Sequence, residues 1–146
     1  KEIKELTRKS TRVYSGGQFE WPVPGYYTLS SYYGGRTDPV YGGYAFHNGI
    51  DIPAPAGTSV LAAADGEVIA AGYINGYGYT IIIDHGSGIT TLYGHNSQLV
   101  ASVGQFVQRG QVISKVGSTG KSTGNHCHFE VRINGSHTNP IPYLSK

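Results

Sequence analysis

The sequence is poor in charged residues, cysteine and methionine. Charged residues make up 14% of its 146 positions, against about 25% in typical domains, which excludes a coiled coil and a highly charged disordered tail. One cysteine excludes an intramolecular disulfide framework and a cysteine-rich zinc site. No apolar run approaches the roughly 20 residues of a membrane-spanning helix. The net charge of +2, with no basic stretch interleaved with aromatic residues, argues against nucleic acid as a partner.

Glycine and tyrosine are abundant instead, with 22 and 12 residues. From residue 59 onward, short apolar runs rich in β-branched residues alternate with glycine turns, and no long helical window occurs. This pattern predicts an all-β domain, a two-sheet antiparallel sandwich or a barrel. The expected strands lie within residues 59–64, 67–74, 79–85, 89–95, 106–117 (two strands) and 126–133.

The chain length suits one domain. Residues 1–20 are expected to form an N-terminal arm or linker. Its charge is concentrated in residues 1–12, which could be a solvated arm or the end of an upstream helix. Residues 21–146 have the composition of a globular domain. The chain starts at Lys1 and has no methionine, so we expect a processed or excised part of a longer protein, with any targeting segment or upstream regulatory domain outside it.

Two short histidine motifs could bind a metal. His47 and Asp51 are four residues apart, and the glycine and proline nearby argue against a helix, which places the pair on a loop that enters a strand. His126 and His128 open a predicted strand, where alternation puts both imidazoles on one face and Cys127 on the other. Two histidines and one aspartate could hold zinc with one position open for water, which is typical of catalytic zinc.

Each motif also has an ordinary structural interpretation. An isolated His-x-x-x-Asp is often a surface hydrogen bond, and His-x-His often lies on a solvated edge strand. A further histidine at a strand end, His95, makes coincidence less credible and favours a metal site. We expect His85 to cap a strand turn, His137 to be solvent-exposed and Cys127 to be a small core residue.

The segment Gly120-Lys121-Ser122 resembles the end of a phosphate-binding loop. That motif requires glycine at position 115, where this chain has Lys115. We therefore reject nucleotide binding.

Most of the chain from residue 21 to 144 resembles the lysostaphin-type (LytM-like) zinc metallopeptidases, which cut peptidoglycan cross-bridges. The resemblance is carried by WPVPG (21–25), FHNGIDIPAPAGTSVLAAADGEVIAAG (46–72), IIIDHGSGITTLYGHNSQL (81–99) and VGQFVQRGQVISKVGSTGKSTGNHCHFEVRINGS (103–136). Departures from the family pattern occur at Cys127, where leucine or valine is common, and at Asn125, where proline is common. Neither changes the face that carries the histidines.

The resemblance implies a role for each residue of the two motifs. His47, Asp51 and His128 match the zinc ligands, while His95 and His126 match two histidines that flank the bound water and the substrate carbonyl. It implies one catalytic Zn²⁺ and a fold of the duplicated-hybrid type. The glycine-rich loops and the tyrosines of this chain favour an open groove for an extended peptide. Which of the two flanking histidines is the general base stays open, with His126 favoured. The family also has a substrate-side tyrosine, for which this chain offers several candidates.

The expected function is therefore that of a zinc-dependent endopeptidase hydrolysing amide bonds in peptidoglycan cross-links or stem peptides. We expect a bacterial monomer that is secreted, periplasmic or cell-wall associated. One alternative is a non-catalytic zinc-binding adaptor for the cell wall or a partner protein. Another is a phosphocarrier or lipoyl-type carrier, but Asp51 has no evident task in phosphohistidine chemistry.

Overall fold

The computed structural model describes residues 13–14, 16–37 and 44–145, and the helix end considered for the arm lies outside these residues. Strands dominate the described part, and its only helical segment is the 3-10 helix η1, Ile141–Tyr143. The strands are β1 (Gly34–Thr37), β2 (Tyr44–His47), β3 (Ile50–Pro53), β4 (Ser59–Leu61), β5 (Gly66–Ile74), β6 (Gly78–Gly86), β7 (Ile89–Leu99), β8 (Phe106–Val107), β9 (Val112–Val116), β10 (His126–Ile133) and β11 (Ser136–Thr138). No helix in the described ranges has the length and apolar character needed to cross a membrane.

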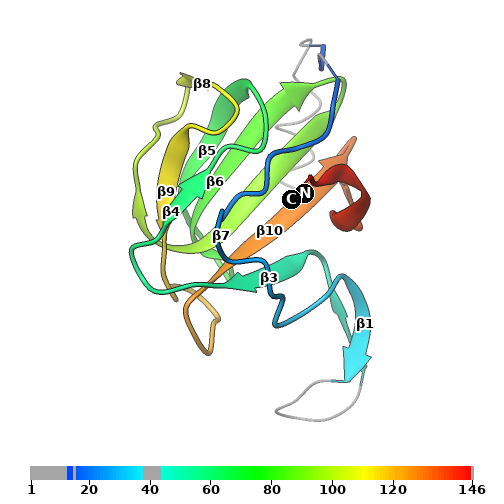
Figure 1. Cartoon of the computed structure of the whole chain (residues 1–146), viewed down its shortest axis with the longest axis vertical. Coiled ribbons are helices and arrows are strands. Elements are labelled where there is room, and N and C mark those ends of the chain that lie inside the picture. The colour runs from blue at the N-terminus through cyan, green and yellow to red at the C-terminus, as the bar shows by residue number, and fades with distance from the viewer. Residues whose placement is uncertain (1–12, 15, 38–43, 146) are drawn as a thin grey trace.

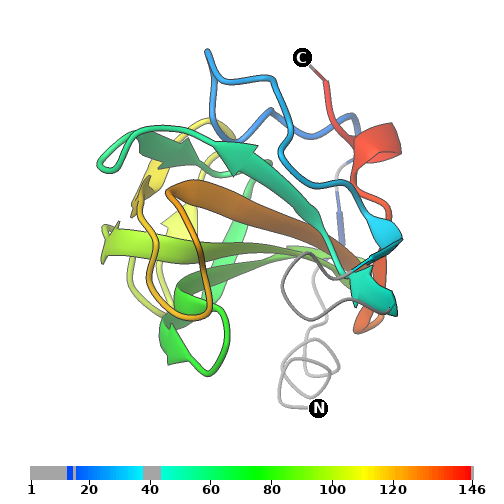
Figure 2. The same ribbon diagram turned by 90° about the horizontal axis from the view of Figure 1, so that it is seen from below.

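Strands β3 through β11 pair with one another in a single antiparallel sheet. Its main path runs β11-β10-β7-β6-β5-β8, while β3 pairs with β10, and β9 pairs with both β7 and β4. The hairpin β1–β2 forms a separate two-stranded sheet. In Figure 1, strands β5, β6, β7 and β10 form a broad layer, and β3, β4 and β9 lie in front of it. Figure 2 shows the same layering from below. The predicted all-β, two-layer antiparallel fold is confirmed.

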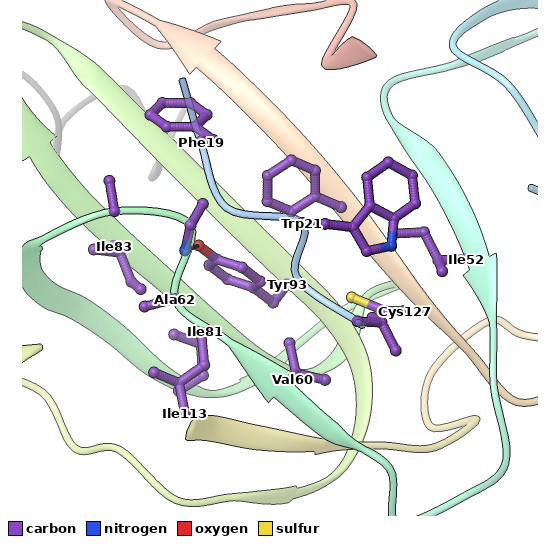
Figure 3. Packing of buried hydrophobic residues seen from close by; sticks show 14 of the residues in the cluster. Phe19, Trp21, Ile52, Val60, Ala62, Ile81, Ile83, Tyr93, Ile113 and Cys127 are labelled. Atoms are coloured by element: carbon purple, nitrogen blue, oxygen red, sulfur yellow. Dashed lines mark hydrogen bonds between the residues drawn. The ribbon is translucent and has the colours of Figure 1, made fainter. Parts of the chain in front are cut away.

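The core fills the space between these layers (Figure 3). Strands β4 and β6 contribute Val60, Ile81 and Ile83, all fully buried. Tyr93 of β7 is also buried, and its hydroxyl accepts a hydrogen bond from the Ala63 backbone (2.9 Å), which provides a partner for the polar end of a large core side chain. The runs of β-branched residues therefore form strands whose apolar side chains fill the space between the two layers.

The segment before residue 21 also packs on the core. Phe19, within the predicted arm, is only 1% exposed, and Trp21 is 3% exposed. The Phe19 backbone N–H donates to the Tyr143 carbonyl (2.7 Å), and the Ser145 N–H donates to the Phe19 carbonyl (2.9 Å). Both ends of the described chain thus meet beside the main sheet. A domain boundary at residue 20 stays a prediction.

Candidate metal centre

The first histidine motif spans a tight connection between two strands. His47 is the last residue of β2 and Asp51 lies inside β3, so the expected loop is only the turn at Asn48 and Gly49. A Cβ atom at Gly49 would collide with the Phe129 carbonyl and approach the Glu130 side chain at 2.9 Å. Glycine is needed there because β3 passes so close to β10.

The second motif lies at the start of β10, with its side chains placed as alternation predicts. His126 and His128 both line one groove, whereas Cys127 points into the core and is fully buried. The antiparallel register sets His128 opposite Asp51 of β3 on one side and opposite Gly94 of β7 on the other. Because β10 pairs with both strands, it brings the two motifs together and places His95 beside them.

Three donor atoms form a nearly equilateral triangle at this point. His128 Nδ1 lies 3.0 Å from Asp51 Oδ1 and 3.2 Å from His47 Nε2, and His47 Nε2 lies 3.3 Å from Asp51 Oδ1. Ligands about 2.0–2.1 Å from a tetrahedral Zn²⁺ would be separated by about 3.3 Å. These three atoms fit zinc in donor type and in spacing.

The outer nitrogen of each ligand-candidate imidazole is anchored. His47 Nδ1 lies 3.1 Å from the Tyr32 carbonyl oxygen and 3.1 Å from Ser31 Oγ. Donation of the Nδ1–H to that carbonyl leaves Nε2 free to face the cluster. His128 is turned the other way, since its Nε2 lies 2.7 Å from Glu130 Oε2 and its Nδ1 faces inward. Anchoring of this kind fixes which nitrogen is available to a metal.

The charges of the cluster stabilise one another. Burial opposes ionisation of Asp51, but the hydrogen bond from His128 and the positive charge of that ring hold the pKa of the Asp51 carboxyl group well below the usual range. Burial alone would lower the pKa of His128, yet its hydrogen bonds to Asp51 and Glu130 raise that pKa to about 9. Protonated His128 thus faces a carboxylate on each side, Asp51 at Nδ1 and Glu130 at Nε2.

His95 and His126 form a second pair beside the triangle, with ring centroids 4.8 Å apart. His95 Nδ1 lies 2.7 Å from the Thr119 carbonyl and His126 Nδ1 lies 2.8 Å from the Gly124 carbonyl. Since a carbonyl only accepts, each Nδ1 donates its N–H to that oxygen, and Nε2 is the nitrogen left for other contacts. Burial lowers the pKa of His95 and favours its neutral form. His126 Nε2 is 3.4 Å from Asp51 Oδ1 and so faces the cluster.

His95 also has an unusual backbone conformation, with φ of 63°. Non-glycine residues rarely adopt this left-handed region, and such strain often accompanies functional sites. The Tyr77 carbonyl holds this conformation by accepting the His95 backbone N–H at 2.7 Å.

All five residues border one open groove of about 760 Å³. Its remaining walls come from the loops around residues 30–31, 76–77 and 121–125, which are rich in glycine and serine. Small side chains allow a ligand backbone to approach closely. Lys121 of the rejected phosphate motif is one of these wall residues.

The two other histidines differ from expectation. His85 is 2% exposed and lies 2.8 Å from the Asp65 carbonyl and 2.7 Å from Thr91 Oγ1, so it is a core residue. The side chain that bonds the turn after β6 is Asp84, which accepts the Gly86 N–H. His137 is half-buried, and its Nδ1 lies 2.9 Å from the Tyr33 hydroxyl, which corrects the expected solvent exposure.

Sequence reasoning missed the polar residues beneath the site. Glu130 is fully buried and contacts His128, Arg132 and Tyr77. A charged residue two positions beyond a ligand candidate on an alternating strand shares its face. The spacing of two residues between His128 and Glu130 could therefore have indicated that Glu130 lies beside the ligand candidates.

Comparison with known proteins identifies the family. The pattern of "Peptidase family M23" matches residues 45–140. The chain is 46% identical over 116 residues to the DD-carboxypeptidase/endopeptidase Mpg of Neisseria meningitidis, covering 80% of this chain and 27% of Mpg. It is 40% identical over 130 residues to the murein hydrolase activator EnvC of Escherichia coli, covering 89% of this chain and 30% of EnvC. The chain thus spans less than a third of these curated relatives.

Solved structures agree with the sequence relatives. A zinc containing peptidase from Vibrio cholerae superimposes with a TM-score of 0.80 at 34% identity, over 86% of this chain and 40% of the other. The catalytic domain of lysostaphin from Staphylococcus simulans gives a TM-score of 0.72 at 33% identity, over 80% of this chain and 91% of the other. With the family pattern extending from β2 to the segment before η1, this chain belongs to peptidase family M23.

Proposed function

We propose that this domain is a zinc-dependent endopeptidase that hydrolyses amide bonds in peptidoglycan cross-links or stem peptides. The observation that carries the proposal is a triangle of zinc-type donors beside two further imidazoles at one open groove. The domain, proposed as residues 21–146, would act outside the cytoplasm, where peptidoglycan lies, as part of a longer chain. Its relatives are between three and four times longer than the matched segment.

His47, Asp51 and His128 would hold one zinc ion. A bound zinc ion supplies Lewis-acid polarisation of a carbonyl and lowers the pKa of a bound water toward about 7. Asp51 contributes the one negative charge among the three donors and the histidines contribute neutral nitrogens. This combination leaves a fourth position for water or substrate.

His95 and His126 would handle the proton. In each ring Nδ1 faces a backbone carbonyl, so Nε2 is the nitrogen that could accept a proton from a water between the pair and the cluster. The ring that has taken the proton can then donate an N–H to a developing oxyanion, or deliver the proton to the leaving amine. His126 is our preferred base because its Nε2 faces Asp51 directly.

The shape of the groove supports an extended peptide as substrate. It is open, and small residues such as Gly76, Ser122 and Gly124 line its walls, which leaves room for a peptide backbone to lie along it. Two relatives are described as peptidases, which is consistent with a peptide substrate. Mpg is a DD-carboxypeptidase/endopeptidase, and lysostaphin is an antimicrobial peptidase.

A second candidate function is that of a non-catalytic activator. The 40% identity with the murein hydrolase activator EnvC favours it. The presence of all three ligand candidates and both flanking histidines at one groove favours the enzyme instead.

Paired substitutions test the roles. We expect Asp51→Ala or His128→Ala to abolish stoichiometric zinc binding, because each removes one of three donors. We expect His126→Ala to keep zinc and to lower hydrolysis of purified peptidoglycan about 10²–10⁴-fold, as for loss of a general base. Elemental analysis measures the zinc, and mass spectrometry of released muropeptides measures the cleavage and identifies the bond.

His137→Ala provides the matched control, since it removes a histidine outside the groove lining and should leave zinc content and hydrolysis intact. If wild-type protein binds one zinc ion but releases no muropeptide, the activator function stands. Normal hydrolysis by His126→Ala would refute the role assigned to that residue.

A further inference from the structure

Glu130 carries a carboxylate that the proposed reaction does not use. It lies on β10 two residues beyond His128 and is fully buried. Its Oε2 accepts hydrogen bonds from His128 Nε2 (2.7 Å) and from the Tyr77 hydroxyl (2.6 Å), and its Oε1 accepts one from Arg132 Nε (2.7 Å). Carboxylates are almost never buried this completely without partners. Here three donors surround it.

Tyr77 connects this carboxylate to the rest of the site. Its hydroxyl accepts hydrogen bonds from Arg132 Nη2 (3.2 Å) and from the side chain of Asn48. Its ring packs against His128 with centroids 5.4 Å apart. Because its carbonyl holds the left-handed backbone of His95, one residue contacts both the ligand cluster and the proton-transfer pair.

The turn between β2 and β3 lies against Glu130 and Tyr77. At Gly49 an added Cβ would lie 2.9 Å from the Glu130 side chain. Asn48, its neighbour, reaches Tyr77. The turn that joins the strands of His47 and Asp51 therefore contacts the residues that hold His128.

We propose that Glu130, fixed by Tyr77 and Arg132, is a positioning residue that orients His128 with Nδ1 toward His47 and Asp51 and thereby sets the zinc affinity of the site. This inference rests on the proposed zinc-dependent function. An imidazole can offer a metal either nitrogen, and the hydrogen bond made by the other nitrogen decides which. Outer partners of this type change metal affinity about 10–100-fold when they are replaced.

The competing explanation is purely structural, with Glu130 present only to neutralise Arg132. The two explanations differ in what a substitution changes. A positioning role alters zinc affinity and the state of the His128 ring in a protein that stays folded. A purely structural role alters the stability of the zinc-free protein and leaves zinc affinity as it was.

The test is a zinc titration in competition with a chromogenic chelator, with circular dichroism and thermal unfolding of each zinc-free variant. We expect Glu130→Gln to weaken zinc binding about 10–100-fold, since the amide keeps the shape but loses the charge. Tyr77→Phe removes one hydroxyl and should weaken zinc in the same direction by a smaller factor. If Glu130→Gln does not fold, the zinc affinity of Tyr77→Phe decides the test instead.

Thr90→Val is the matched control. Thr90 pairs with Arg132 across β7 and β10, and its buried hydroxyl has no hydrogen-bond partner among the described residues. We expect the Thr90→Val variant to bind zinc with the same affinity as the wild type. A slowly exchanging, downfield imidazole N–H proton from His128 should appear in the proton NMR spectrum of the wild type and of Thr90→Val, and shift or vanish in Glu130→Gln.

Unchanged zinc affinity in folded Glu130→Gln, or in Tyr77→Phe if the first variant is unfolded, would overturn the positioning role. An unchanged imidazole resonance would do the same. Failure of the wild type to bind zinc is a different result, because it would overturn the proposed function itself. The two failures are therefore distinguishable without any measurement of hydrolysis.

Discussion

His85 and His128 are both buried histidines whose surroundings favour opposite protonation states. Burial lowers the pKa of His85 to about 4, which its hydrogen bond to the Asp65 carbonyl only partly offsets. His128 has Asp51 and Glu130 on its two nitrogens, and its pKa is raised to about 9 despite burial. Desolvation lowers the pKa of both rings. The difference is that both nitrogens of His128 are hydrogen-bonded to carboxylates, whereas the carboxylates of Asp84 and Asp65 act on His85 only through their charge.

The lowered pKa of His85 predicts acid sensitivity. The unfolded chain binds a proton at this residue below pH 6.5, whereas the folded chain binds it only near pH 4. Stability is therefore fully present above about pH 6.5 and falls as the pH decreases toward 4, by on the order of 3 kcal/mol. Urea unfolding of the zinc-free protein at a series of pH values from 7 to 4 measures this loss.

His85→Gln supplies the control, because glutamine does not titrate and its amide can still reach Thr91. This variant should have a flatter dependence of unfolding free energy on pH over the same window, even if it is less stable at pH 7. Equal slopes for the two proteins would show that other groups cause the acid sensitivity. His128 contributes in a different window, since its raised pKa adds stability that is present below pH 6.5 and lost as the pH rises through 9.

At the scale of elements, the contact between β3 and β10 builds the site. Their register sets Asp51 opposite His128, and the close approach at Gly49 allows the preceding turn to place His47 at the same point. A shift of one residue would turn every side chain of β10 to the opposite face. His128 would then enter the core and Cys127 would face the groove.

Gly49→Ala tests this contact. The added methyl group would collide with the Phe129 backbone, so β3 must move away from β10. We expect a loss of stability of about 1–3 kcal/mol or more, as for overpacking, together with weaker zinc binding. Thermal unfolding and chelator competition measure the two effects.

Gly72→Ala in β5 is the comparison, since a Cβ there would meet no atom within 4 Å. Alanine is less flexible than glycine in the unfolded chain, so we expect unchanged or slightly higher stability and unchanged zinc binding. If Gly49→Ala behaved like Gly72→Ala, the close approach would have no energetic consequence.

At the scale of the whole molecule, segments from both ends of the chain complete the core. Phe19 stacks on Tyr143 with ring centroids 6.0 Å apart and lies 5.3 Å from the His85 ring. Trp21 packs in the same apolar cluster as Cys127, the residue between the two site histidines (Figure 3). The face of β10 opposite the groove is thus supported by residues from the N-terminal part of the chain.

We therefore expect Phe19→Ala to destabilise the protein by about 3–5 kcal/mol, the usual cost of removing a buried aromatic ring. Chemical denaturation provides the measurement. Val13→Ala is the paired change in the same segment, and because Val13 is 79% exposed it should have almost no effect. A small effect of Phe19→Ala would place Phe19 in a dispensable arm.

The sequence by itself determined the long strands and the kinds of side chain that could bind a metal. Alternation and glycine turns suffice for β5, β6, β7 and β10, because those patterns depend on local periodicity. The types and spacing of His47, Asp51, His126 and His128 indicate a metal, because few other roles need that set. The burial of His85 and of His137 could not be predicted from local sequence, because it depends on residues that are distant in the chain.

Only the tertiary structure decided how these parts meet. Strand β10 pairs with β3 and β7 at once, which brings donors 77 or more positions apart in the chain to within 3.3 Å of one another. The role of Glu130 is also a tertiary result, because its partner Tyr77 comes from a turn 53 residues away. Local patterns fix which way a side chain points along its own strand. The pairing of strands, which depends on packing of the complete core, fixes what that side chain then touches.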